Sequence, residues 1–118
     1  MEIGKKIWVF PDAEMPPKGE NEIPGHESII ITNVTNEIAN VNISLIYTDK
    51  EPKDFVVQVA ARRVRCLRSN NAQDFCGHTA IEGEQYAIVL ESNVPIVAQY
   101  GRAEPRKVAF YTTPGYCE

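Results

Sequence analysis

The fold class of this chain is decided by residues 92–102, which read Ser-Asn-Val-Pro-Ile-Val-Ala-Gln-Tyr-Gly-Arg. Asn93 and Pro95 favour a tight turn, and Pro95 also restricts the residue before it to an extended conformation. The apolar run after the turn is too short for an ordinary helix and is rich in β-branched residues. We therefore expect a strand at residues 86–90 to end in this turn and to pair with a second strand at residues 96–100.

The clearest strand signal lies between residues 39 and 49. Here Val41, Ile43, Leu45 and Tyr47 alternate with other residues at a period of two, which is typical of a strand with one buried face. The alternation predicts that these four side chains point into the core.

The rest of the chain also reads as short apolar runs separated by turns. Further strands are expected at residues 7–10, 28–34, 55–59, 62–68 and 107–112. Pro11 is expected to end the first of them, a Pro- and Gly-rich loop to follow at residues 12–25, and Pro114 to close the set. Without any helical pattern, the sequence predicts an all-β fold, an antiparallel β-sandwich of about seven to eight strands.

Length and charge limit the class of protein. The chain has 118 residues, which is enough for a single domain over residues 1–118 with a core of its own. Its 12 Lys and Arg against 16 Asp and Glu give a net charge of −4, which argues against nucleic acid as the main partner. The local exception is residues 62–68, with four arginines in seven residues.

The remaining composition favours an intracellular protein without a cofactor. No apolar run approaches the length of a membrane span and no signal-peptide core begins the chain, so a cytoplasmic location is expected. Cys66, Cys76 and Cys117 lack CxxC spacing and are expected to be free thiols. The two histidines, His26 and His78, are too few for a catalytic metal centre, and no Gly-x-Ser-x-Gly motif is present. We therefore expect no enzyme activity.

Five short motifs, in the same order along the chain, resemble those of the sensory rhodopsin transducer family. They are Met-Pro-Pro-Lys-Gly at 15–19, His-Glu at 26–27, Tyr-Thr-Asp-Lys-Glu-Pro at 47–52, Val-Ala-Ala-Arg-Arg at 59–63 and the stretch at 92–102. The chain departs from the family pattern in having Gly25 for Ser and Ala60 for Pro. It departs again at residues 103–107, where Ala-Glu-Pro-Arg-Lys replaces an Asp-containing segment.

The resemblance implies a β-sandwich with jelly-roll character that assembles as a homotetramer. It also implies a binding and signalling module rather than an enzyme. Founding members of the family are thought to relay the state of a membrane photoreceptor. Other members have been proposed to bind sugars or other small ligands.

Several polar or aromatic side chains are candidates for a ligand site. They are His26, Glu27, Tyr47, Asp49, Arg63, Gln99 and Arg102. Arginine and glutamine donate hydrogen bonds, carboxylates accept them and tyrosine offers a flat wall, which suits a polyhydroxylated or anionic small molecule. Gln99 and Arg102 differ by an odd number of positions, so they share a pocket only if a bulge intervenes, for which Gly101 is a reasonable place.

Each candidate also has a structural interpretation. Glu27 or Asp49 would pair with an arginine at a sheet edge, Tyr47 would belong to the core, and the arginines of residues 62–68 would protect an edge strand from aggregation. Three functions stay open. The first is a non-catalytic module that binds a small polar ligand such as a sugar, and the second is a transducer that docks on a membrane receptor. The third and weakest is a small metal-dependent enzyme.

Overall fold

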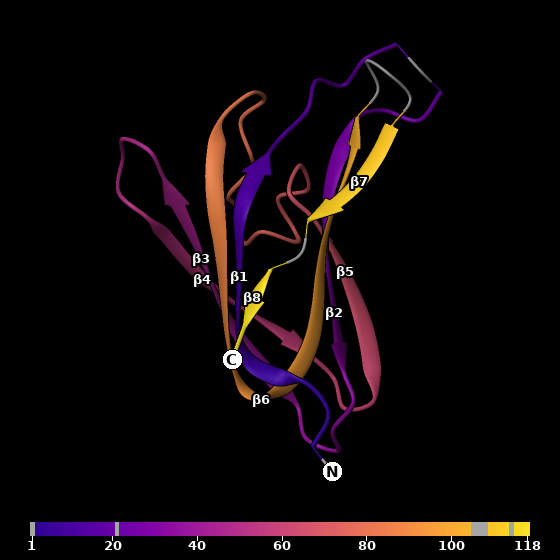
Figure 1. Ribbon diagram of the computed structural model, residues 1–118, viewed down its shortest axis with the longest axis vertical. Helices are drawn as coiled ribbons and strands as arrows, with labels where there is room; N and C mark the ends of the chain where they lie inside the picture. The colour runs from indigo at the N-terminus through magenta and orange to yellow at the C-terminus, as the bar shows by residue number, and fades with distance from the viewer. Residues whose placement is uncertain (1, 21, 105–108, 114) are drawn as a thin grey trace.

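The computed structural model is built from β-strands (Figure 1). It describes residues 2–20, 22–104, 109–113 and 115–118, with the backbone alone described for 109–113. The strands are β1 (Lys5–Glu14), β2 (His26–Asn33), β3 (Ala39–Tyr47), β4 (Lys53–Val59), β5 (Arg63–Arg68), β6 (Gln85–Glu104), β7 (Ala109–Thr113) and β8 (Tyr116–Cys117). No helix occurs in these described ranges, and so none that could cross a membrane.

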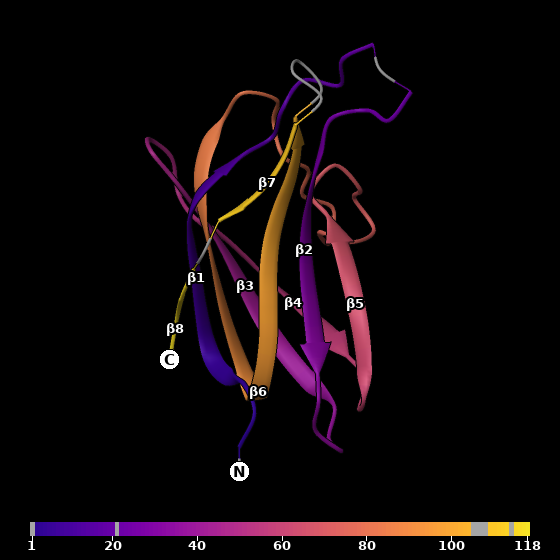
Figure 2. The same ribbon diagram turned by 45° about the vertical axis from the view of Figure 1, so that its right-hand side comes forward.

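Two antiparallel sheets share the long strand β6. The first half of β6 pairs with β3 and β1 in the order β4-β3-β6-β1-β8. The second half pairs with β2 and β7, and β5 extends that sheet beyond β2. Figure 2 shows the two sheets facing each other with β6 passing from one to the other. The predicted antiparallel β-sandwich is therefore confirmed.

The predicted hairpin around Asn93–Pro95 is wrong, because the two expected strands and the turn between them form the single continuous strand β6. The chain does reverse direction there (Figure 1), but the two arms of β6 join different sheets instead of pairing with each other. The Asn93 side chain explains why, because its Oδ1 accepts a hydrogen bond from the Asn40 backbone N–H at 2.7 Å and its Nδ2 donates to Ile38 O at 3.3 Å. These bonds attach the bend to the start of β3.

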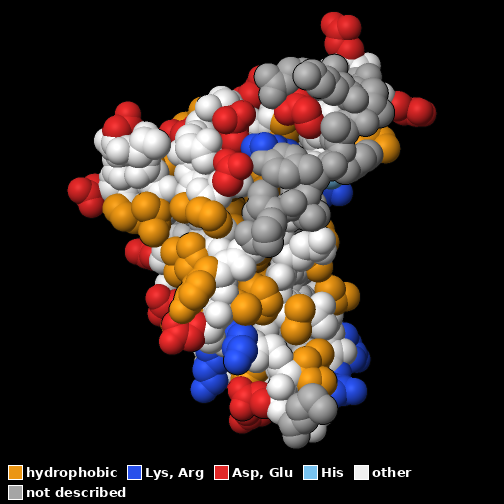
Figure 3. Space-filling model, viewed as in Figure 1, with side chains coloured by type: hydrophobic (Ala, Val, Ile, Leu, Met, Phe, Trp, Pro, Cys, Tyr) orange, Lys and Arg blue, Asp and Glu red, His pale blue; other side chains and the backbone are white. Residues whose placement is uncertain are grey.

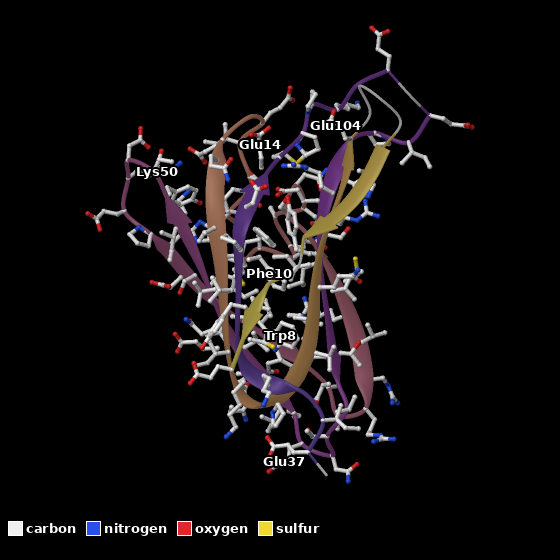
Figure 4. All side chains as sticks on the ribbon, viewed as in Figure 1. Trp8, Phe10, Glu14, Glu37, Lys50 and Glu104 are labelled. Carbon is white, nitrogen blue, oxygen red and sulfur yellow. The ribbon has the colours of Figure 1, made fainter. Side chains whose placement is uncertain are left out.

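The beginning of β1 holds the other side of the same bend. The Trp8 indole Nε1–H donates to Ile96 O at 3.1 Å and to Lys5 O at 3.0 Å. Gly4 has a φ of 93°, and a Cβ there would lie 2.6 Å from Ile96 O, so only glycine fits. Figure 4 shows Trp8 and Phe10 between the two arms of β6. The bend is thus packed on both sides.

The core lies between the sheets and follows the predicted alternation. Val41 and Ile43 are fully buried and Leu45 is 3% exposed, as the period of two requires. Tyr47, which was expected to belong to the core, is half-buried and packs against it from the end of β3. The inward residues of β4, Phe55, Val57 and Val59, are buried as well.

Some predicted boundaries are wrong for reasons visible in the sheet. Strand β1 continues past Pro11 to Glu14, because a register shift between Phe10 and Ala13 places the exposed proline where the ladder is interrupted. The first three residues of the predicted loop therefore belong to a strand. Residues 107 and 108 of the predicted final strand, and Pro114 after it, lie outside the described residues. The short strand β8 was not predicted.

Candidate functional site

Three of the predicted site residues lie together at the start of β2. Glu27 lies directly opposite Arg102 of β6 in an unbroken antiparallel register, with His26 beside it. Glu27 occupies an inward position, two residues before the buried Ile29, and it has no exposed surface. A fully buried carboxylate is rare unless its oxygens are hydrogen-bonded.

The Glu27 carboxylate accepts hydrogen bonds from three hydroxyl groups. Ser69 Oγ and Tyr86 Oη each lie 2.6 Å from Oε1, and Tyr100 Oη lies 2.5 Å from Oε2. We call these four residues the Glu27 cluster. Tyr86 and Tyr100 come from the two arms of β6, and Ser69 follows β5, so one side chain of β2 connects both sheets.

Burial is the main influence on the tyrosines of the Glu27 cluster. It raises the pKa of Tyr86 and of Tyr100 strongly, because a phenolate would lose its hydration, and the negative charge of Glu27 raises both further. Both tyrosines therefore remain hydrogen-bond donors at physiological pH. The Glu27 cluster is a satisfied polar centre inside the sandwich, and a ligand in solvent does not reach the Glu27 carboxylate in this conformation.

The neighbours of Glu27 contact backbone carbonyls. Arg102 Nη1 donates to Glu14 O at 3.2 Å, near the end of β1 where Figure 4 labels Glu14. His26 Nδ1 lies 2.8 Å from Pro24 O. These contacts bring the ends of β1 and β6 and the loop before β2 together around the Glu27 cluster.

The remaining candidates do not join this group. The Tyr47 ring lies 6.1 Å from that of Tyr86, but it faces the Lys50 ammonium at 4.3 Å, and Asp49 is exposed in the turn beyond it. Gln99 pairs with Ile30 and is exposed on the outer face, because the register shows no bulge at Gly101. Gln99 and Arg102 therefore lie on opposite faces of the sheet.

Arg63 lies at the far end of β2, opposite Asn33. That position is about 20 Å along the strand from Glu27. Here the surface is hollowed into a cavity of about 450 Å³, which we call the Arg62–Arg63 cavity. Its lining residues are Ile3, Thr32, Asn33, Val34, Arg62, Arg63 and Val64. Figure 3 shows basic side chains gathered over this lower end of β5.

Asn33 makes the wall of this cavity rigid. Its buried Nδ2 donates to Glu37 O at 2.7 Å and to Val59 O at 3.1 Å, and its Oδ1 accepts the Thr35 backbone N–H at 3.0 Å. One side chain therefore connects the turn after β2 to the end of β4. An amide that bonds backbone groups on both sides fixes two turns relative to each other.

Arg62 is held in an uncommon conformation in the second turn. Its φ of 59° lies in the left-handed region that non-glycine residues rarely adopt. Two hydrogen bonds stabilise it there, from its backbone N–H to Thr35 O at 3.1 Å and from its Nη1 to Val34 O at 2.9 Å. The cavity is thus largely pre-formed before any ligand arrives.

Of the residues that line this cavity, the sequence predicted only Arg63 as a site residue. Thr32, Asn33 and Arg62 were not predicted. The signal for Asn33 was its inward position at the end of an apolar strand, where a polar residue needs partners. The same reasoning applies to Tyr86 and Tyr100, which lie two positions from the apolar residues Ile88 and Ala98 and so share their inward face.

The described residues contain no group of three or more His, Cys, Asp or Glu side chains that could hold a metal ion. Cys66, Cys76 and Cys117 are free thiols at exposed positions.

Comparison with known proteins agrees with the fold and with the motifs. Residues 3–117 match the family described as Anabaena sensory rhodopsin transducer. The chain belongs to this family. The crystal structure of Thermotoga maritima 1070 is similar with a TM-score of 0.84 and 29% identity, over 98% of this chain and 96% of that one. The Anabaena sensory rhodopsin transducer itself is similar with a TM-score of 0.74 and 34% identity, over 85% of this chain and 89% of that one. No curated protein matches the chain.

Membership in the transducer family makes this protein a transducer-type module with a β-sandwich framework. In this member the carboxylate of the His-Glu motif lies within the sandwich, in the Glu27 cluster. The arginine motif at residues 59–63 ends at the Arg62–Arg63 cavity.

Proposed function

We propose that this transducer-family protein is a non-catalytic module that binds a small anionic or polyhydroxylated molecule in the Arg62–Arg63 cavity. The observation that carries the proposal is a pre-formed cavity of about 450 Å³ with two arginines in its lining. Pockets for small ligands commonly measure about 300–1,000 Å³. The proposal keeps Arg63 from the predicted site residues and adds Arg62, Thr32 and Asn33.

The lining suits a ligand with both charge and carbon surface. Each guanidinium carries five N–H donors, of which Arg62 and Arg63 give one each to the carbonyls of Val34 and Arg62. The remaining donors match a carboxylate or phosphate in a two-point contact. Ile3, Val34 and Val64 supply apolar surface for a sugar ring. We therefore propose sugars and sugar acids as the ligand class.

A ligand there would have a direct route to the rest of the fold. It would touch the two turns that Asn33 holds together, one between β2 and β3 and one between β4 and β5. These turns connect one sheet to the other, so occupancy of the cavity would stiffen the junction between sheets. A signalling module needs such a difference between its free and bound states.

A thermal-shift screen against sugars, sugar acids and small phosphates tests the proposal, followed by titration calorimetry of any compound that raises Tm. Arg63→Gln should weaken binding about tenfold or more, since a charge-assisted hydrogen bond contributes about 1.5–3 kcal/mol. Arg68→Gln is the matched control, because it removes the same charge from the same strand outside the cavity. A panel without any shift, or equal losses in both variants, would refute it.

A second candidate function rests on the 34% identity to the Anabaena sensory rhodopsin transducer. We propose, as the alternative, a cytoplasmic transducer that docks on a membrane receptor of the rhodopsin type and assembles as a homotetramer. Co-sedimentation with receptor-containing vesicles tests the docking, and light scattering tests the tetramer. Binding to vesicles without the receptor, or a clean monomer, would count against these respective parts.

A further inference from the structure

The edge strands β4 and β5 belong to different sheets and differ in whether their outward backbone groups have hydrogen-bond partners. On β4, two of the backbone carbonyls that point away from β3 accept contacts from side chains. Arg65 Nη1 donates to Gln58 O at 2.9 Å, and Cys76 Sγ lies 3.6 Å from Val56 O. These contacts occupy two of the acceptor positions where another strand would pair with β4, so this edge is partly blocked.

The edge of β5 is open by comparison. β5 pairs with β2 only, and in Figure 2 it forms the outer border of its sheet. The Arg68 backbone shows which groups face outward, because its N–H donates to Asp74 Oδ2 at 2.9 Å and its carbonyl accepts from the Asn71 N–H at 3.1 Å. Since backbone direction alternates along a strand, the N–H and C=O groups of Cys66 and Val64 also point away from β2.

These outward groups have no hydrogen-bond partner within the described part of the chain. Both side chains are accessible, with Val64 63% exposed and Cys66 exposed as a free thiol. The edge therefore offers two donors and two acceptors at the spacing of a β-ladder. No bulge interrupts this edge, because the β2–β5 register has no irregularity over its six residue pairs.

The positive charge of β5 limits which kinds of molecule can pair with its edge. Arg63 and Arg65 lie on one face of the strand, and Val64 and Cys66 lie on the other. A second copy of β5 paired so that Val64 lies opposite Val64 or Cys66 would bring arginines opposite arginines, which is destabilising. A nucleic acid would offer phosphate acceptors to the N–H groups, but it would leave the outward carbonyls of Val64 and Cys66 without donors. A peptide strand supplies both.

We propose that the outer edge of β5 binds an extended acidic segment of a partner protein by strand addition. Acidic side chains on alternate positions of that segment would face Arg63 and Arg65, and apolar side chains between them would lie over Val64 and Cys66. Main-chain hydrogen bonds to the edge provide affinity in this mode, and the alternate side chains provide specificity. The inference goes beyond ligand binding. Arg63 and Val64 belong both to this edge and to the Arg62–Arg63 cavity, whereas Arg65 and Cys66 belong to the edge alone.

The test uses a fluorescein-labelled peptide of alternating Glu and Val, with anisotropy as the readout on the whole protein. A peptide with Lys in place of Glu is the charge control, and we expect it not to bind. Binding of the Glu peptide should weaken as salt increases, since the contacts are exposed. Equal binding of both peptides, or none of the Glu peptide at low salt, would overturn the proposal.

The variant Cys66→Pro separates strand addition from charge attraction alone. Proline removes the outward N–H and leaves the ladder to β2 intact, since the Cys66 N–H does not point to β2. We expect the peptide Kd to rise at least about tenfold in Cys66→Pro and to stay unchanged in the matched control Cys66→Thr. Circular dichroism confirms that both variants are folded. Unchanged peptide affinity in a folded Cys66→Pro protein would overturn the inference.

Cys66 does not line the Arg62–Arg63 cavity, so small-ligand binding should survive this substitution. Failure of the edge proposal and failure of the cavity proposal are therefore distinguishable. A change of oligomeric state in Cys66→Pro would show that a second copy occupies the edge, which would also overturn the proposal.

Discussion

Tyr86 and Tyr100 should make the stability of this protein fall steeply above pH 10. Both phenol groups donate to the buried Glu27 carboxylate, and burial and the Glu27 charge raise the pKa of each well above its ordinary value. In the unfolded chain the same groups ionise with a pKa of about 10. Because the folded pKa is the higher one, the stabilisation is complete below pH 10 and is lost as the pH rises above it.

The size of the effect follows from proton linkage. Above pH 10 each tyrosine binds one more proton in the folded state than in the unfolded state, so the free energy of unfolding falls by about 1.4 kcal/mol per pH unit per tyrosine. At pH 11 each has cost about 1.4 kcal/mol, and the pair about 3 kcal/mol, relative to pH 8. That is a large share of the stability of about 5–15 kcal/mol typical of a domain.

Urea unfolding followed by far-UV circular dichroism between pH 8 and pH 11, under reducing conditions, measures this slope. Tyr86→Phe and Tyr100→Phe should each reduce the slope above pH 10 by about 1.4 kcal/mol per pH unit. The matched control is Tyr116→Phe. Tyr116 is 58% exposed and lies outside the cluster, and its hydrogen bond to Glu118 also raises its pKa, so this variant measures what an exposed tyrosine contributes to the slope. If the double variant Tyr86→Phe/Tyr100→Phe keeps the wild-type slope, the reasoning about the Glu27 cluster is refuted.

Three further substitutions test other parts of the structure by urea unfolding at neutral pH. Asn33→Ala should lower the free energy of unfolding by about 2–3 kcal/mol, since carbonyls on two turns lose a buried donor. A loss below about 0.5 kcal/mol, which is the size of an ordinary surface change, would contradict the role of Asn33. Gly4→Ala should lower the free energy of unfolding by about 1–3 kcal/mol, and by more than Gly83→Ala, because Gly83 has a similar φ but open space around it. Equal losses in the two variants would argue against a clash with Ile96. Lys50→Ala should change stability by less than about 1 kcal/mol, because its ion pair with Glu84 is partly exposed, and a larger loss would be unexpected.

The alternation of Val41, Ile43 and Leu45 predicted a buried strand face correctly, because the period of a strand is a property of neighbouring residues. The change of direction at Asn93–Pro95 was also local and was found, but as a bend inside the single strand β6 and not as a turn between two strands. Its consequence for pairing was not, since hydrogen bonds from Asn93 to the start of β3 decide where the two arms of β6 go. The candidate site was predicted only in part. Glu27 lies at the start of β2, whereas Arg63 of β5 lies beside Asn33 at its other end, so these two predicted site residues do not share one pocket.

The amino-acid order alone thus determined that this chain forms short strands and turns, which of their faces are apolar, and to which family it belongs. Tertiary structure alone decided that Glu27 is enclosed by hydroxyls from both arms of β6, that Asn33 joins two turns around a cavity, and that β5 is left with an open edge. The physical reason is range. Backbone preference and side-chain alternation act over a few residues, whereas burial and hydrogen bonding join Glu27 to Tyr100 across 73 positions of the chain.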